Sequence, residues 1–243
     1  MPLREDFEKT GNLLFRYRSY FPLLLLPLIL ATISRPPEPS ALEETWDKFC
    51  FLVTAIGLVL RALTVGYVPK GTSGRNTKRQ KAEHLNSTGM YSVVRHPLYL
   101  ANFMVWLGMV LFTKSLWCVL VAVLAFWIYY ERIMFAEEEF VREKYGEEYL
   151  KWAENVPAFI PRLRNWKTPR MSFSMKSVLA REYTTIFVAV SYFVLMDTLE
   201  NFFQVGELSV DPFWRNLFVL TAVFYGLVRL VKKKTRVLKV EGR

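Results

Sequence analysis

Residues 115–135 read SLWCVLVAVLAFWIYYERIMF, an apolar run whose only charged side chains are Glu131 and Arg132 near its end. An α-helix needs roughly 20 mostly apolar residues to cross a bilayer, and this run is long enough. Three other blocks are comparable, namely Phe49–Val68, Tyr183–Phe203 and Pro212–Val231. The pattern predicts helices that span a membrane, because a soluble domain has no use for several such blocks.

Two shorter apolar blocks bring the expected number of spans to about six. The first, Tyr20–Ser34, carries two prolines and could extend back to Leu13. The second, Tyr99–Phe112, is separated from the run at 115–135 by only Thr113 and Lys114. Such a short link favours a helical hairpin. The expected fold is therefore an all-α, polytopic transmembrane bundle with a cytoplasmic helical region.

The distribution of basic residues predicts the orientation of the chain. The net charge is +10 although 52% of the residues are hydrophobic. With six spans, 27 Lys and Arg residues lie on one side of the membrane and four on the other, with Arg61 inside a span. Short basic loops remain cytoplasmic, so both termini are predicted inside. We interpret the charge as attraction to anionic lipid headgroups and expect no nucleic-acid partner.

The chain divides into three expected parts. Residues 1–48 hold the first span and its loop, residues 49–165 hold the core with the cytoplasmic helical region, and residues 166–243 form an extension of two spans with a basic tail. Cys50, Cys118, His84 and His96 have no metal-ligand spacing, so no metal site is expected. Arg61 is either functional, as an intramembrane charge usually is, or lies one turn from the surface.

The first motif ends the cytoplasmic stretch Pro69–Leu98 and reads GMYSVVRHPLY over residues 89–99. Pro97 is expected to begin a helix, because its missing N–H would be unpaired in the first turn anyway. His96 then lies at the helix N-terminus, where anions are attracted, and Tyr99 lies on the first turn.

The second motif opens the stretch Glu137–Lys176 and reads EEEFVREKYGEEY over residues 137–149. It is expected to continue the preceding span as a helix. Glu138, Val141, Tyr145 and Tyr149 recur at helical spacing and can share one face.

Together the two motifs resemble the isoprenylcysteine carboxyl methyltransferase family, with phospholipid N-methyltransferases as wider relatives. The family pattern is matched in the first motif at Gly89, Tyr91, Arg95, His96, Pro97 and Tyr99, and in the second at Glu137, Glu138, Gly146 and Tyr149. Val156-Pro157 also fits the pattern, whereas Ala101 stands where the family commonly has glycine. The resemblance covers roughly residues 49–161.

The resemblance implies that S-adenosylmethionine is the cofactor, with S-adenosylhomocysteine as product. His96 and Tyr99 are then expected at its polar ends, and Glu137 or Glu138 at its α-amino group. Leu85, Tyr91 and Tyr149 are expected around the adenosine. The full set of expected cofactor residues is Leu85, Gly89, Tyr91, Arg95, His96, Pro97, Tyr99, Glu137, Glu138 and Tyr149.

The expected reaction is O-methylation of an anionic lipid or lipidated substrate, such as a lipid A phosphate or a prenylated-cysteine carboxylate. The predicted catalytic residues are Arg132 and Glu138. Arg132 is chosen because a guanidinium is always charged and can grip two oxygens. Alternatively, Arg132 only anchors its span by reaching to lipid headgroups. The bacterial inner membrane is the expected location.

Two other functions remain open at this point. Membrane reductases of the sterol-reductase type, which use NADPH, share an Arg-His-Pro-x-Tyr segment. They typically have Asn before the Tyr and Gly-Glu after it, whereas this chain has Leu98 before and Leu100-Ala101 after. A non-catalytic membrane scaffold is the other alternative, and it should not bind S-adenosylhomocysteine.

Overall fold

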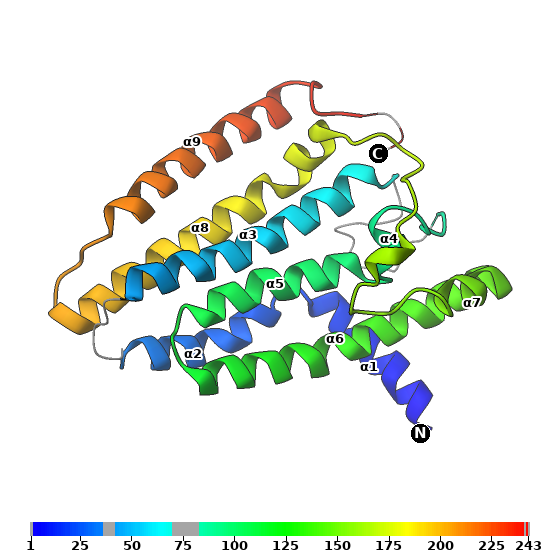
Figure 1. Cartoon of the computed structure of the whole chain (residues 1–243), viewed down its shortest axis with the longest axis horizontal. Coiled ribbons are helices and arrows are strands. Elements are labelled where there is room, and N and C mark those ends of the chain that lie inside the picture. The colour runs from blue at the N-terminus through cyan, green and yellow to red at the C-terminus, as the bar shows by residue number, and fades with distance from the viewer. Residues whose placement is uncertain (1, 36–41, 70–82, 241, 243) are drawn as a thin grey trace.

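The computed structural model describes residues 2–35, 42–69, 83–240 and 242, and this part of the chain contains helices and no strands (Figure 1). The basic residues between 70 and 82, which contribute to the predicted cytoplasmic charge, lie outside the described part. In chain order the elements are α1 Leu3–Tyr17, α2 Phe21–Ile33, α3 Glu43–Tyr67, α4 Met90–Val93, α5 Pro97–Leu111, α6 Leu116–Tyr145, α7 Glu147–Ala153, the 3₁₀ helix η1 Leu163–Asn165, α8 Met175–Val205 and α9 Pro212–Lys234.

Four helices, α3, α6, α8 and α9, are long and apolar enough to cross a membrane, and each contains one of the four long apolar blocks. The bent pair α1–α2 makes a fifth candidate if it counts as one span, and α5 is a shorter apolar helix. The all-α membrane fold is therefore confirmed. The count of six is approximate, because it depends on α2 and α5, the two blocks that were already short in the sequence.

Local sequence signals set where several helices begin. Pro97 occupies the first turn of α5, as its missing N–H predicts. The side chains of Ser115 and Asp211 accept hydrogen bonds from the backbone N–H groups of Cys118 (3.4 Å) and Phe213 (2.7 Å), at the starts of α6 and α9. The predicted hairpin is confirmed, since α5 ends at Leu111 and α6 begins at Leu116.

Helix α5 lies against α3 at very close range because small residues meet there. A Cβ atom built on Gly57 would lie 2.7 Å from the carbonyl oxygen of Ala101, and one on Gly108 would lie 2.3 Å from Oγ1 of Thr54. Ala101, where the related family commonly has glycine, is fully buried in this contact. Gly57 leaves room on α3 for the close approach of the Ala101 backbone.

Helices α1 and α2 meet at an angle of 72°, so the first apolar block does not extend back to Leu13 as one straight helix. Helix α1 instead docks on the last part of α6. Arg4 forms an ion pair with Glu139, and the hydroxyl of Tyr129 donates to the carbonyl oxygen of Leu14 at 3.0 Å. The amphipathic α1 therefore lies beside the second motif.

Two ion-pair groups join α8 to the bundle. Near one end, Arg61 of α3 donates to both carboxylate oxygens of Glu182 on α8 (2.7 and 3.1 Å) and also to Asn102 of α5. At the other end, Lys114 in the hairpin turn pairs with Glu43 and Glu200. Both motifs lie at the end of the bundle opposite Lys114, where α4 and α7 gather (Figure 1).

Candidate active site

The first motif begins with a tight turn that depends on glycine. Gly89 has a φ of +60°, in the region that favours residues without a side chain. Its N–H donates to the carbonyl oxygen of Lys167 at 2.9 Å, and its carbonyl accepts from the hydroxyl of Ser92 at 2.7 Å. This turn starts α4, which contains Tyr91 and ends at Val93, two residues before Arg95.

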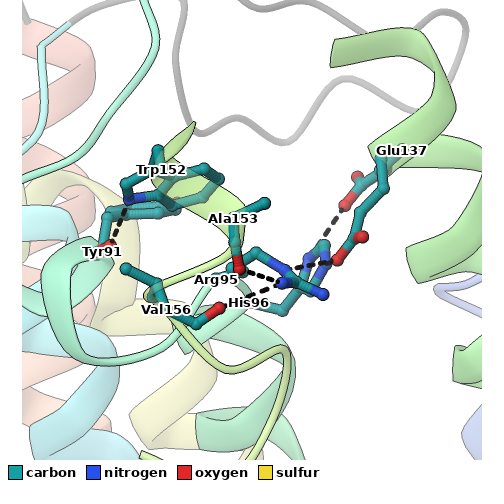
Figure 2. Close-up of polar contacts among 8 residues, drawn as sticks. Tyr91, Arg95, His96, Glu137, Trp152, Ala153 and Val156 are labelled. Carbon is teal, nitrogen blue, oxygen red and sulfur yellow. Dashed lines mark hydrogen bonds and ion pairs between the residues drawn. The ribbon is translucent and has the colours of Figure 1, made fainter. Parts of the chain in front are cut away.

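Arg95 connects three segments of the site (Figure 2). Its guanidinium donates to Oε1 of Glu138 at 2.8 Å and to the carbonyl oxygens of Ala153 (2.8 Å) and Val156 (3.0 Å). Its backbone N–H also donates to the carbonyl oxygen of Pro157 at 2.8 Å. The Val156-Pro157 pair noted in the sequence therefore serves as a fixed partner for the first motif.

His96 and Tyr99 meet the two carboxylates of the second motif. Nε2 of His96 lies 2.8 Å from Oε1 of Glu138, and Nδ1 lies 3.7 Å from Oε2 of Glu137. The hydroxyl of Tyr99 donates to Oε1 of Glu137 at 2.8 Å. The His96 side chain is only 8% exposed, whereas about a quarter of each carboxylate side chain faces solvent. The two carboxylates therefore remain partly accessible, whereas the imidazole is buried.

The second motif continues the preceding span as a helix, as predicted, but only as far as Tyr145. Helix α6 ends at Tyr145, and Gly146, with a φ of +52°, turns the chain into α7. The single face expected from Glu138 to Tyr149 is therefore wrong. Tyr149 is nevertheless buried and hydrogen bonded to Glu138, and burial, followed by the charge of Glu138, raises the pKa of its phenol.

A cavity of about 280 Å³ opens beside α4. It is lined by two of the residues expected around an adenosine, Leu85 and Tyr91. Tyr91 lines this cavity and is also close enough to Glu137 for that charge to affect the pKa of its phenol. Burial raises the pKa of the Tyr91 phenol, and the charge of Glu137 raises it further. The indole N–H of Trp152 donates to the Tyr91 carbonyl oxygen at 3.2 Å and fixes the position of this residue (Figure 2).

The structure places six residues of the expected cofactor set in one cluster, namely Arg95, His96, Tyr99, Glu137, Glu138 and Tyr149. Leu85 and Tyr91 line the cavity, Gly89 lies in the turn before α4, and Pro97 begins α5 directly after His96. Arg132 lies elsewhere. The guanidinium of Arg132 donates to Oγ1 of Thr10 at 2.9 Å and lies 3.4 Å from Oδ2 of Asp6, both on α1. It also lies over the ring of Phe7, 4.6 Å from its centre. Its predicted role toward an acceptor stays a prediction.

Arg18, which lies beside Glu137, was not predicted from the sequence. It follows α1, its Nη1 lies 3.8 Å from Oε1 of Glu137, and its side chain is 17% exposed. Trp152 and the residues after 165 that reach the cavity were not predicted either. Arg18 could not be found from the motifs, because it belongs to a segment far away in sequence that reaches the site only through the 72° bend.

Comparisons with known proteins agree with the two motifs. Residues 50–148 match the family model described as phospholipid methyltransferase. A protein-S-isoprenylcysteine O-methyltransferase B of Arabidopsis thaliana is 25% identical over 152 residues, which cover 58% of this chain and 74% of that protein. The resemblance inferred from the motifs is therefore confirmed for this segment, which contains the first motif and all of the second except Tyr149.

Two bacterial relatives are named as metal-resistance proteins and not as methyltransferases. A nickel-cobalt-cadmium resistance protein of Alcaligenes xylosoxydans xylosoxydans is 30% identical over 125 residues, covering 51% of this chain and 56% of that protein. A cobalt-zinc-cadmium resistance protein of Cupriavidus metallidurans is 37% identical over 84 residues, 35% of this chain and 38% of that protein. The match thus spans little more than half of the length of the nickel-cobalt-cadmium resistance protein, and less than half of the length of the cobalt-zinc-cadmium resistance protein. No solved structure matches the chain significantly.

Proposed function

We propose that this protein is an integral membrane methyltransferase that uses S-adenosylmethionine to methylate an anionic group of a lipid or lipidated acceptor. The observation that carries the proposal is the convergence of His96 and Tyr99 with Glu137 and Glu138, at distances of 2.8 Å, beside a cavity of suitable size. Small-molecule pockets have volumes on the order of 300 Å³ or more. The family match of residues 50–148 supports methyl transfer over hydride transfer.

The residues present fit the chemical groups of the cofactor. An α-amino group needs carboxylate acceptors, which Glu137 and Glu138 supply. A sulfonium is favoured near aromatic faces, and the rings of His96 and Tyr99 stack with 5.7 Å between their centres. An adenosine needs an apolar wall with few polar groups, and Leu85 and Tyr91 line the cavity accordingly. Gly89, Arg95, Pro97 and Tyr149 then hold these residues in place.

The chemistry requires positioning more than proton transfer. When bound, the cofactor supplies a methyl group on positively charged sulfur. An anionic acceptor oxygen forms the new C–O bond as the C–S bond breaks, and the electron pair stays on sulfur. A phosphate or carboxylate is already ionised at neutral pH, so the protein needs no general base. Holding two reactants in line can supply roughly 7–11 kcal/mol.

The acceptor needs a fixed cation that orients it without neutralising it. We propose Arg18 for this role, because its guanidinium lies 3.8 Å from Oε1 of Glu137. It is held over the ring of Phe15, 4.0 Å from its centre. Arg132, through Thr10 and Asp6, then keeps α1 in the position that brings Arg18 to the site.

The acceptor is proposed to enter with its tail in the bilayer. Tyr99 is the last ring of an aromatic column that continues through Tyr130 to Phe126, with centre distances of 5.0 and 4.2 Å. Phe126 lies well inside the apolar part of α6, so the column runs from the bilayer core to the carboxylates. A lipid phosphate and a prenylcysteine carboxylate both satisfy this arrangement.

The site end of the bundle is proposed to face the cytoplasm of a bacterial cell. Lys232, Lys233 and Lys234 end α9 at the same end of the bundle as α4 (Figure 1). Basic residues next to a span remain on the inner side. Labelling of a cysteine introduced near Lys233 by an impermeant reagent, in sealed cells, would refute this orientation.

Calorimetry with purified protein distinguishes the proposal from its alternatives. A methyltransferase binds S-adenosylhomocysteine, a reductase binds NADPH, and a scaffold binds neither. Mass spectrometry of total lipids, with and without expression of the protein, then identifies the acceptor by a methyl-sized mass increment. Binding of NADPH without binding of S-adenosylhomocysteine would overturn the proposal.

A further inference from the structure

The segment between η1 and α8, residues 166–174, is fixed against the first motif. The N–H of Lys167 donates to Oγ of Ser92 at 2.9 Å, and its carbonyl oxygen accepts from the N–H of Gly89 at 2.9 Å. Pro169 packs so closely that a Cβ atom on Gly89 would lie 3.2 Å from its Cγ. This segment follows the residues 50–148 that match the phospholipid methyltransferase model.

The other end of the same segment is fixed to α3. The N–H of Ser174 donates to the carbonyl oxygen of Gly66 at 2.9 Å. The ring of Phe173 lies on Gly66, where a Cβ atom would be 2.2 Å away, and 5.2 Å from the ring of Tyr67. Because both ends are held, the residues between them form a fixed wall.

Arg170 and Met171 lie in that wall and line the cavity beside α4. Leu85, Asn86 and Tyr91 line the same cavity. The amide nitrogen Nδ2 of Asn86 is buried and has no hydrogen-bond partner among the described residues. A buried amide donor without a partner is unfavourable and uncommon, which points to a ligand group that completes it.

We infer that Asn86 recognises the adenine edge of the cofactor, and that the segment 166–174 closes the adenine pocket with Arg170 at its mouth. An asparagine amide can donate to an adenine ring nitrogen and accept from the exocyclic amine, so the two edges pair at two points. A planar guanidinium can lie over the base and attract its π-face. The apolar contacts come from Leu85, Tyr91 and Met171.

This assignment rests on the proposed function, and it goes beyond it in two respects. It names the group that selects adenine, which neither motif contains. It also gives the C-terminal part of the chain a role in the cofactor site, since Arg170 and Met171 belong to residues 166–243. Asn86 is partly exposed as a residue and Arg170 is largely exposed, so the interaction of Arg170 with the base is expected to be the weaker one.

Isothermal calorimetry with two probes tests the assignment on the full-length protein in detergent. The probes are S-adenosylhomocysteine and S-inosylhomocysteine. In the second probe a carbonyl oxygen, which accepts a hydrogen bond, replaces the exocyclic amine, which donates one. The wild type should bind the adenine form about tenfold more tightly or better, the range for one paired edge. Asn86→Ala should lose most of this preference, whereas Arg170→Gln should weaken both probes about threefold and keep the preference.

Controls and a second variant make the outcomes separable. Asn201→Ala, at the far end of α8, and Arg164→Gln, on the exposed η1, should behave as wild type. If Asn86→Ala does not fold, Asn86→Ser takes its place. Wild type that binds S-adenosylhomocysteine without preferring it, or an Asn86 variant that keeps the preference, overturns the inference alone. Wild type that binds neither probe overturns the proposed function.

Discussion

Oε1 of Glu138 is shared by two neighbouring residues of the first motif, since Nε of Arg95 and Nε2 of His96 both lie 2.8 Å from it. Tyr149 adds a further hydrogen bond to the same carboxylate. Glu137 has Tyr99 at 2.8 Å, and His96 and Arg18 lie farther away at 3.7 and 3.8 Å. The two adjacent carboxylates therefore have different surroundings, and the structure predicts different roles for them.

Replacing each carboxylate by its amide should separate these roles. Glu137→Gln should weaken binding of S-adenosylhomocysteine about 10- to 150-fold, the value of one hydrogen bond to a charged group, with little change in thermal stability. Glu138→Gln should weaken binding and also lower the melting temperature, because Arg95 loses its charged partner. Calorimetry and thermal unfolding measure the two effects. Glu143→Gln, on the exposed face of α6, is the matched control. Equal melting temperatures for both variants would contradict the division of roles.

Arg18 and Arg132 are expected to respond differently to lysine. Lysine keeps the positive charge but loses the planar fork that grips two oxygens. Arg18→Lys should raise the apparent KM for the acceptor and lower turnover severalfold, with cofactor affinity near wild type. Arg132→Lys should keep most of the turnover, because its contacts are to Asp6 and Thr10 on α1.

Labelled methyl transfer into extracted lipid measures both arginine variants, with Arg16→Gln on the exposed side of α1 as the control. A sharp loss of turnover in Arg132→Lys, with normal turnover in Arg18→Lys, would return the acceptor role to Arg132. The same loss in Thr10→Val would instead indicate that the position of α1 is critical.

The contact between α3 and α5 should not tolerate a larger residue at Gly57. A methyl group there would lie 2.7 Å from the carbonyl oxygen of Ala101, which is backbone and cannot turn aside. Gly57→Ala should therefore destabilise the protein by about 1–3 kcal/mol, as overpacked cores do. Gly226→Ala is the control, because nothing lies within 4 Å of its Cβ position. It should be neutral or slightly stabilising, since alanine favours helices. Equal melting temperatures for the two variants would contradict the packing.

The ion pair between Arg61 and Glu182 should matter most when only one partner is removed. The two side chains are 17% and 5% exposed, so an unpaired guanidinium would remain largely buried. Glu182→Ala should destabilise the protein by about 3–5 kcal/mol, whereas the double variant Arg61→Met with Glu182→Met should recover most of the loss. Thermal unfolding in detergent compares them. A double variant less stable than Glu182→Ala would show that the pair is favourable in itself.

Much of the fold could be predicted because membrane helices depend on length and apolarity, which are local properties. The long blocks, the hairpin at Thr113-Lys114 and the helix that starts at Pro97 were all found from neighbouring residues alone. The break at Gly146 was missed, since the helical spacing of Tyr145 and Tyr149 continues across it. A positive φ at one glycine changes the direction of the chain without changing the apolar pattern.

The candidate site was predictable where residues lie within one motif and unpredictable where distant segments meet. His96, Tyr99, Glu137 and Glu138 share two short stretches whose order implied their meeting. Arg18 and Arg170 come from segments outside those stretches, and only tertiary packing places them at the site. Arg132 is the opposite case. Its position in the sequence predicted a place in the site, but its guanidinium binds Thr10 and Asp6 on α1 instead.

We propose that the carboxylates of the second motif hold a cofactor whose methyl group passes to an anionic lipid or lipidated acceptor. The most direct test uses purified protein in nanodiscs made from the total lipids of the expression host, supplemented with a farnesylated cysteine, and S-adenosylmethionine labelled on its methyl group. We expect label in an anionic acceptor after organic extraction, and its loss in Glu137→Gln. Wild type that binds S-adenosylhomocysteine yet transfers no label to any extracted acceptor would contradict the account.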